Sequence, residues 1–141
     1  MEKLKITIGI DVKADLLTVW ERWTGPEHVV NWNFATDTWH CPKATNDLRP
    51  GGRFSYTMAA KDGSFSFDFE GKYLAVEPQR SIEISLDDDR KVWVTFSETG
   101  GVTTVKEVFE AEDQNSAEMQ RAGWQSILEN FRTYVESTKA V

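Results

Sequence analysis

Hydrophobic and polar residues alternate at the start of the chain with a period of two. The hydrophobic positions are Leu4, Ile6, Ile8, Ile10 and Val12, and polar residues or glycine separate them. A period of two is typical of a β-strand that buries one face. The first segment, residues 4–12, is therefore predicted to be a strand.

The period then changes to that of a helix. Within ADLLTVWERWT, residues 14–24, the hydrophobic residues have the helical spacing i, i+3, i+4, i+7. They are Leu16, Val19, Trp20 and Trp23. This spacing predicts a short helix that ends near Thr24. Pro26 suits the first position of a second short helix, which is expected to reach about Trp32.

From residue 34 to about 110 the pattern is that of β-structure interrupted by turns. The turn signals are Pro50-Gly51-Gly52, Lys61-Asp62-Gly63, Glu77-Pro78, Asp87 to Asp89 and Gly100-Gly101. Between the turns, alternation predicts three groups of residues that each share one face of a strand. They are Phe65, Phe67, Phe69, Gly71 and Tyr73, then Ile82, Ile84 and Leu86, then Val92, Val94 and Phe96. Turns at this spacing predict consecutive antiparallel hairpins. Pro50-Gly51-Gly52 fits a type II turn with Gly51 at its third position.

After Asp113 the helical period returns. One stripe is formed by Trp124, Ile127, Leu128, Phe131, Tyr134 and Val135. Asn115 and Glu118 resemble a capping box at the start of a helix over 115–137, which would be about 35 Å long. Gly123 in its middle costs about 1 kcal/mol relative to alanine, so either a strand comes close there or room is left for something else.

These elements predict a single α+β domain spanning residues 1–141. Their order is one strand, two short helices, about six further antiparallel strands and a long C-terminal helix. So long an apolar stripe needs a broad apolar surface opposite, and the sheet is the available one. A sheet that curls around the helix can enclose space between its concave face and that helix.

Composition and charge exclude several classes of partner. The formal net charge is −7, with no cluster of Lys or Arg, so neither a nucleic acid nor an anionic membrane is expected as a partner. The N-terminus shows no apolar stretch that could serve as a signal or a membrane span. One cysteine allows no internal disulfide, and both features favour a cytoplasmic protein.

Four stretches resemble a known family. They are TGPEHVVNW, DLRPGGRFSY, DGSFSFDFEGKYLAVEP and QRAGWQSILENFRTYV, in that order and spacing. They resemble the homologues of the activator of heat-shock protein 90 ATPase, within the START and birch-pollen-allergen superfamily. Gly123-Trp124 and Pro50-Gly51-Gly52 are the most specific parts. The resemblance implies a helix-grip fold, in which a curved sheet of six or seven strands wraps the C-terminal helix around a cavity. The superfamily includes binders of lipids, hormones and polyketides, cyclases, hydratases and co-chaperone domains.

The stretch HVVNWNFATDTWHCPKA contains His28, His40 and Cys41, which could suggest a metal or nucleophile site. His40 and Cys41 are neighbours on a predicted strand, so their side chains point to opposite faces. Their spacing matches no zinc pattern. We therefore expect neither a metal nor another cofactor, and we interpret Cys41 as a small buried hydrophobic residue.

The aromatic residues point to a ligand. Trp32, Phe34 and Trp39 are expected at the mouth of the cavity, although each could simply fill the core. The predicted ligand-binding residues are Trp20, Trp32, Phe34, Trp39, Tyr56, Phe67, Phe69, Phe96, Glu107, Trp124, Leu128 and Phe131. Such an aromatic interior suits a planar or lipid-like molecule.

Glu107 is the candidate polar group inside this cavity. If Val105 and Phe109 face inward, strand alternation places Glu107 between them, where loss of solvation would raise its pKa. If Val102 and Val108 face inward instead, Glu107 lies in solvent. The sequence leaves both alternatives open.

Three functions are compatible with these features. The first is binding of a small apolar or aromatic molecule, which predicts an open interior of roughly 300 Å³ or more. The second is a chaperone-activator-like interaction module, which predicts a large exposed patch and a collapsed cavity. The third is an enzyme of the hydratase or cyclase kind, which predicts at least two polar groups converging inside the cavity.

Overall fold

The computed structural model describes residues 4–137. Its elements, in chain order, are β1 (Lys5–Val12), α1 (Leu16–Thr24), α2 (Pro26–Val29), β2 (Trp39–Asn46), β3 (Arg53–Ala60), β4 (Ser66–Glu77), β5 (Ser81–Leu86), β6 (Lys91–Thr99), β7 (Val102–Glu110) and α3 (Ala117–Ser137). The strands form one antiparallel sheet of seven, in the order β1-β7-β6-β5-β4-β3-β2. The predicted helix-grip fold is confirmed.

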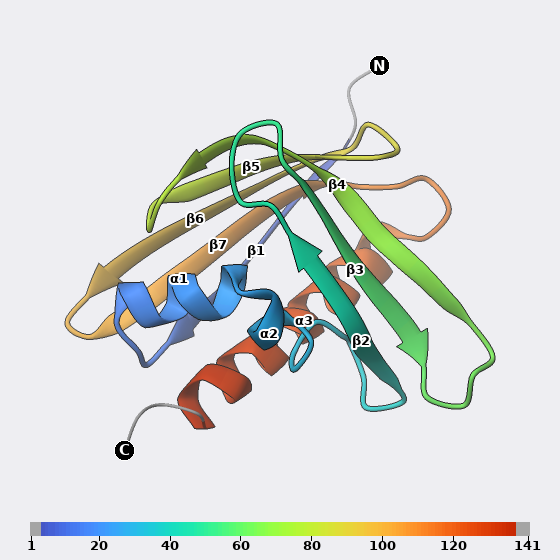
Figure 1. Cartoon of the computed structure of the whole chain (residues 1–141), viewed down its shortest axis with the longest axis horizontal. Coiled ribbons are helices and arrows are strands. Elements are labelled where there is room, and N and C mark those ends of the chain that lie inside the picture. Colours follow the sequence, from blue (N-terminus) through green and yellow to red (C-terminus); the bar gives the residue numbers. More distant parts are fainter. Residues whose placement is uncertain (1–3, 138–141) are drawn as a thin grey trace.

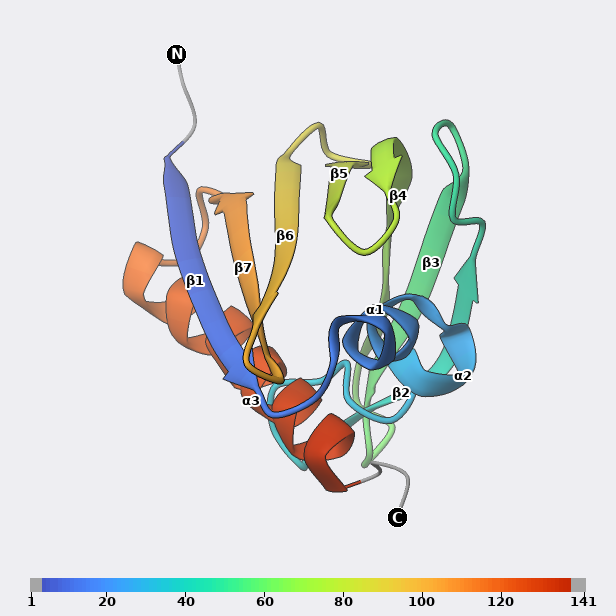
Figure 2. The same ribbon diagram turned by 90° about the vertical axis from the view of Figure 1, so that its left-hand side faces the viewer.

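The sheet curls strongly (Figure 1). Figure 2 shows it as a deep trough, with β1 and β7 forming one wall and β3 and β2 the other. The long helix α3 runs along the β1 side of this trough. The short helices α1 and α2 lie at one end, α1 against β6 and β7 and α2 against β2. The interior is therefore enclosed by helices only in part.

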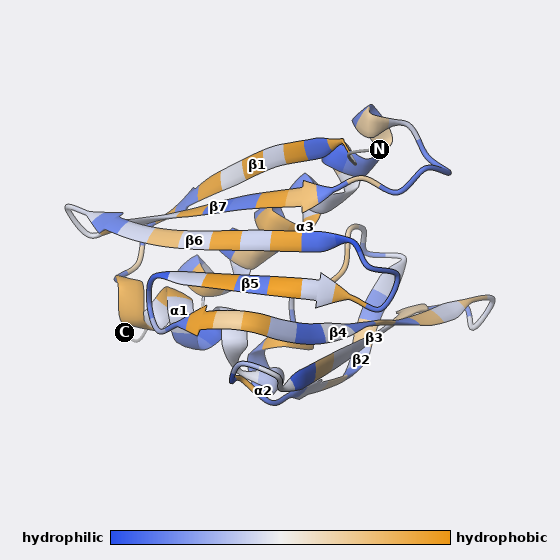
Figure 3. Cartoon of the chain, turned by 90° about the horizontal axis from the view of Figure 1, so that it is seen from above, coloured by the Kyte–Doolittle hydropathy of each residue, from blue (hydrophilic) through white to orange (hydrophobic). Residues whose placement is uncertain are grey.

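The strand β1 follows the alternation of its sequence, since every second residue from Ile6 to Val12 is buried. The same alternation of hydropathy is visible along β5 and β6 in Figure 3. The free edge of β1 is covered by α3. Arg121 donates to the carbonyl of Thr7 at 2.7 Å, and Gln125 donates to the carbonyl of Gly9 at 3.1 Å. These bonds hold the helix against one edge of the sheet.

The turns form as the sequence predicts. Gly51 has φ +84°, and the Gly52 amide donates to the Arg49 carbonyl at 2.8 Å, which together define a type II turn. Gly100 and Gly101 join β6 to β7 with φ values of 60° and 82°. Two consecutive positive φ angles are those of a type I′ hairpin turn, which matches the twist of the strands.

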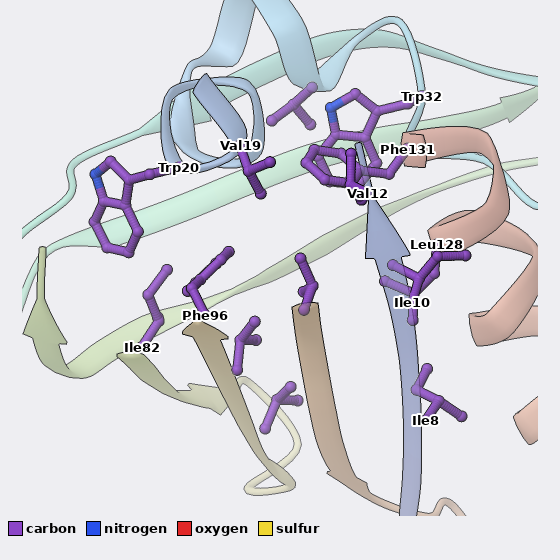
Figure 4. Close-up of a cluster of buried hydrophobic side chains, with 14 of the residues drawn as sticks. Ile8, Ile10, Val12, Val19, Trp20, Trp32, Ile82, Phe96, Leu128 and Phe131 are labelled. Atoms are coloured by element: carbon purple, nitrogen blue, oxygen red, sulfur yellow. The ribbon is translucent and has the colours of Figure 1, made fainter. Parts of the chain in front are cut away.

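The solid part of the core lies beneath α1. Figure 4 shows Val19 and Trp20 of α1 on the side of Phe96 of β6, Trp32 and Phe131 beside Val12, and Ile10 of β1 next to Leu128 of α3 farther along the same core. Val12, Val19, Leu128 and Phe131 are fully buried. This end of the trough is closed by the protein's own side chains.

Two details of the helices differ from the prediction. The helix α2 ends at Val29, and the chain continues as turns, with the Trp32 amide donating to the Val29 carbonyl at 3.2 Å. The cap of α3 is Ser116, whose hydroxyl accepts from the Met119 amide at 3.1 Å. Asn115 does not cap the helix, because its side chain donates to Glu112 instead.

Candidate ligand-binding cavity

A cavity of about 430 Å³, partly open to solvent, lies between the concave face of the sheet and α3. Its walls come from strands β3 to β7, from the N-terminal half of α3, from the end of α1 and the segment after α2, and from the loops before β6 and α3. The lining residues are Trp23, Trp32, Asn33, Ala35, Phe54, Tyr56, Met58, Phe67, Phe69, Tyr73, Ile82, Ile84, Arg90, Val92, Val94, Glu107, Glu112, Asn115, Met119, Gln120, Gly123, Trp124 and Ile127.

Gly123 and Trp124 of α3 explain why this space is open. A Cβ atom at Gly123 would have no neighbouring atom within 4 Å, so the glycine faces free volume. Trp124 stacks on Phe109 of β7, with ring centroids 3.9 Å apart and planes inclined by 7°. The indole holds the helix away from the sheet next to the glycine. Of the two explanations for Gly123, the structure supports the one in which room is left.

Aromatic rings form the wall opposite β7. Phe54 lies 5.2 Å from Tyr56 and 5.8 Å from Phe69, measured between ring centroids. Phe69 in turn meets Trp124 edge-on at 5.9 Å. Gly71 lies beneath the Phe54 ring and against the β5 backbone, leaving no space for a side chain. The close approach of β4 to β5 at Gly71 therefore helps to bring the aromatic wall into place.

The structure brings half of the predicted site residues to the cavity. Those that line it are Trp32, Tyr56, Phe67, Phe69, Glu107 and Trp124. Those outside the lining are Trp20, Phe34, Trp39, Phe96, Leu128 and Phe131.

Most residues outside the lining fill the closed end of the trough. Trp20 and Phe96 contact each other edge-on at 5.3 Å, and Phe131 contacts Trp32 at 4.8 Å. Leu128 is fully buried beside them. Their sequence pattern predicts burial correctly. A residue in the solid core and a residue that faces a cavity have the same pattern, so the pattern does not distinguish them.

Trp39 and Phe34 lie elsewhere. Trp39 packs against Phe65 and Phe67 near the tip of the β3–β4 hairpin, with centroid distances of 6.0 Å to each. The carbonyl of Phe34 accepts a hydrogen bond from Asn130 of α3. Their position in the chain was the reason to expect them at the mouth of the cavity. In the structure neither residue lines the cavity.

Several lining residues are absent from the predicted set. Ile82, Ile84, Val92, Val94 and Tyr73 share strand faces that alternation identifies, and a systematic use of that alternation would find them. Asn33 and Arg90 lie in segments without a period. No sequence signal identifies them as lining residues, because their position depends on how the loops cross the sheet.

Glu107 faces the cavity. Val105 and Phe109 on either side of it in β7 are fully buried, and its partners on the adjacent strands are Ile8 and Val94. The residue is 8% exposed, and burial is the only cause of its pKa shift. Burial raises the pKa of Glu107 to about 8. The inward alternative is thus correct, and the carboxyl group is mainly uncharged at pH 7.

Asn33 is a second buried polar residue in the lining. It is 8% exposed, and its Nδ2 atom has no hydrogen-bond partner in the described part of the chain. Burial raises the pKa of the nearby Cys41 thiol, and the Asn33 amide opposes that rise only as a minor effect. The Asn33 amide nitrogen therefore lies close to the Cys41 thiol and has almost no surface open to solvent.

The tyrosine hydroxyls of the lining are satisfied within the protein. Tyr73 donates to Asn46 Oδ1 at 2.5 Å, and Asn46 Nδ2 donates to the Thr24 carbonyl at 2.6 Å. Tyr56 is hydrogen-bonded to Tyr73. Burial raises the pKa of Tyr73 to about 12 and that of Tyr56 well above its usual value. Both tyrosines remain neutral, and the chain of bonds ties β2, β3 and β4 to the end of α1.

Polar residues border the other end of the cavity. Gln120 of α3 donates to the carbonyls of Glu112 and Asn115, at 3.0 and 2.8 Å, and accepts from the Glu112 amide at 2.9 Å. Arg90 pairs with Asp88 at 2.7 Å. The bonds of Gln120 fix the loop before α3, and the Arg90–Asp88 pair lies within the turn between β5 and β6.

The histidines and the cysteine do not form a reactive cluster. His28 Nδ1 lies 2.6 Å from the Tyr134 hydroxyl, which links α2 to α3. Cys41 is buried on β2, and His40 lies beside it at the partly exposed edge of the sheet. Within residues 4–137, no group of three or more His, Cys, Asp or Glu side chains is arranged to hold a metal ion.

A sequence model of the family described as activator of Hsp90 ATPase homolog 1-like protein matches residues 13–136. The chain belongs to this family. The solution structure of an AHSA1-like protein from Aeromonas hydrophila is 42% identical, with a TM-score of 0.90, over 95% of this chain and 93% of that one. The family assignment agrees with the resemblance drawn from the sequence.

Two further solved structures have the same fold. A protein from Cytophaga hutchinsonii is 46% identical, with a TM-score of 0.82, over 94% of this chain and 92% of that one. A protein from Nitrosomonas europaea is 19% identical, with a TM-score of 0.83 over 96% of each chain, and shows the fold alone. A comparison with curated proteins gave no match. No helix in residues 4–137 is long and apolar enough to cross a membrane.

Proposed function

We propose that this AHSA1-like protein binds a small hydrophobic or aromatic molecule in the cavity between its sheet and α3. The observation that carries the proposal is the cavity of about 430 Å³ beside Gly123, which falls within the usual range for small-molecule sites. Its walls are mostly aliphatic and aromatic side chains. A folded interior is normally packed to a high density, so a space of this size in so small a protein calls for a functional reason.

Affinity would come mainly from burial of the ligand. Each Å² of apolar ligand surface removed from water contributes about 25 cal/mol. Phe54, Phe69 and Trp124 present ring faces and edges on which a planar molecule can lie. Because the cavity is partly open, such a molecule can enter without unfolding of the sheet.

The interaction-module alternative has weaker support. Phe65 and Phe67 are 60% and 42% exposed and lie 6.1 Å apart at the tip of a hairpin, so they form a small exposed aromatic pair. The open cavity is opposite to the collapsed interior that this alternative predicts. Binding of a chaperone by the full chain, measured by pull-down with purified Hsp90, tests it separately.

Titration of the protein with fatty acids, sterols and polyphenols tests the proposed function. We expect saturable changes in amide NMR shifts for residues around Trp32, Phe67 and Trp124. If no member of a broad panel produces a saturable change in these residues, the proposal is wrong.

Two variants at Gly123 provide a matched control. Gly123→Leu extends a side chain into the free volume and is expected to weaken binding by about tenfold or more. Gly123→Ala adds one methyl group to the same helix position and should leave binding within about threefold of the wild type. Equal binding by both variants would mean that the ligand lies elsewhere.

A further inference from the structure

The inward face of the β3–β4 hairpin stays apolar beyond the wall of the cavity. Tyr56 pairs with Phe69 in that wall, and Met58 pairs with Phe67 at the next step toward the tip of the hairpin. Phe65 follows, with its ring centroid 6.1 Å from that of Phe67. From Phe69 to Phe65 the chain advances four residues, or about 13 Å. The apolar face therefore continues from the cavity onto a part of the hairpin that projects beyond the neighbouring strands (Figure 3).

Trp39 of β2 lies beside the two outer phenylalanines. Its ring centroid is 6.0 Å from that of Phe65 and 6.0 Å from that of Phe67. We call these three residues the outer strip. The other face of the hairpin carries polar side chains, and there the Thr57 hydroxyl donates to the Asp68 carboxylate at 2.7 Å. The aromatic residues at this end of the hairpin thus share the face that is continuous with the cavity.

The exposure of the aromatic side chains rises along this face. Phe54 is buried and Phe69 is half-buried, whereas Phe67 and Phe65 are 42% and 60% exposed. Phe67 also belongs to the cavity lining, so the apolar surface is continuous from the interior to the solvent. An exposed apolar patch of this kind, contiguous with a cavity, is typical of a binding surface.

The size of the outer strip indicates what covers it. Three side chains present much less area than the roughly 800 Å² per partner of a stable protein interface. A molecule that is already held in the cavity has lost most of its freedom of motion, so its extension over the strip costs little further entropy. A ligand that leaves the cavity at Phe67 is therefore a better occupant of the strip than a separate partner.

We propose that the outer strip is a second subsite for the same ligand, and that the ligand is an elongated hydrophobic molecule with one end in the cavity and the rest along the β3–β4 hairpin. The inference depends on the proposed function, because it names the chemical class of ligand for the same cavity. A compact ligand would leave the strip in water. A long chain covers it and can keep a polar end group in the solvent beyond the strip.

A series of saturated fatty acids from octanoic to eicosanoic acid, each used below its micelle concentration, tests the length of the site. Each methylene group buried in the cavity should increase the affinity about fourfold. Once the cavity is full, each further methylene group lies on the outer strip with one side in water and should increase the affinity about twofold. Without the strip, the affinity would stop rising at that length.

Two tryptophans report separately on the two subsites. Trp124 lines the cavity, and Trp39 belongs to the outer strip. In protein labelled with 5-fluorotryptophan, their ¹⁹F NMR signals can be assigned with Trp124→Phe and Trp39→Phe. We expect short acids to shift the signal of Trp124 alone and acids longer than the cavity to shift both signals. The chain length at which Trp39 first responds should be the length at which the gain in affinity per methylene group falls.

Two variants assign the longer part of the site. Phe65→Ser removes a ring of the outer strip that is not part of the cavity lining. It should weaken the binding of the longest acids about fivefold or more and that of octanoic acid by less than about twofold. Leu17→Ser on α1 is the matched control, because Leu17 is 47% exposed and lies outside the cavity lining. This control should bind the whole series as the wild type does.

The outcomes separate this inference from the function on which it depends. If the affinity stops rising with chain length and the signal of Trp39 stays unchanged, the cavity binds the acids but the inference is wrong. It is also wrong if Phe65→Ser weakens the binding of octanoic and eicosanoic acid equally. If the wild type dimerises in sedimentation or is retained by Hsp90, and Phe65→Ser does neither, the strip serves a protein partner and the inference is wrong.

If no acid binds, the inference fails, whereas compact sterols and polyphenols still test the proposed function. The wild-type series decides even where a variant does not fold.

Discussion

Glu107 should make the stability of this protein depend on pH. Its carboxyl group has a pKa of about 8 in the folded protein, against 4.5 when it is exposed. Below pH 4.5 the group is protonated in both states and has no effect. Between pH 4.5 and 8 the unfolded chain loses this proton while the folded protein keeps it. The free energy of unfolding therefore falls as pH rises through this window, and above pH 8 the loss is complete.

The size of the effect follows from the shift. One pKa unit corresponds to about 1.4 kcal/mol. At pH 7, therefore, the free energy of unfolding of the wild type should be about 3 kcal/mol lower than at low pH because of this group. Glu107→Gln has nearly the same shape and does not titrate. We expect the variant to be as stable as the wild type at pH 4.5, or slightly less stable. Between pH 5 and 7 the free energy of unfolding of the variant should rise relative to that of the wild type by about 2 to 3 kcal/mol.

Urea unfolding of both proteins at half-unit intervals from pH 4.5 to 9 measures this difference. Tryptophan fluorescence and circular dichroism should give coincident transitions, so that a two-state analysis applies. Other groups titrate in both proteins alike, and the difference between the two curves isolates Glu107. A difference that does not change with pH would mean that Glu107 is solvated or paired, and the burial argument would be refuted.

Three further predictions concern stability and can be measured by urea unfolding. Gly71→Ala should destabilise the protein by about 2 kcal/mol, because the added Cβ would meet the β5 backbone and the Phe54 ring. Alanine is normally acceptable in a strand, so an unchanged urea midpoint would show that β4 and β5 can separate. Asn46→Ala should lower the free energy of unfolding by about 2 kcal/mol, because it removes the acceptor of the Tyr73 hydroxyl and the hydrogen bond to the end of α1. A loss below about 0.5 kcal/mol would mean that these two hydrogen bonds do not stabilise the fold. Ser116→Ala should cost about 1 kcal/mol and Asn115→Ala clearly less, since Ser116 is the helix cap; the reverse order would favour Asn115 as the cap.

The order and type of the elements could be predicted because they depend on local chemistry. Alternation specified β1, the stripe from Trp124 to Val135 specified α3, and the glycines at positions 51, 100 and 101 specified turns that require positive φ. The exact cap of α3 could not be predicted, since Asn115 and Ser116 both suit the position. The choice depended on Glu112, which bonds to the Asn115 side chain.

Periodicity states which face of each element is buried, so the sequence is enough to predict an aromatic interior and a sheet that wraps the last helix. It did not determine which buried residues touch one another and which face empty space. Phe131 and Trp124 belong to the same helical stripe, yet the first closes the core and the second borders the cavity. Only the curl of the sheet and the attachment of α3 to the β1 edge made that distinction, and the inward orientation of Glu107 follows from the register of β7 between β1 and β6.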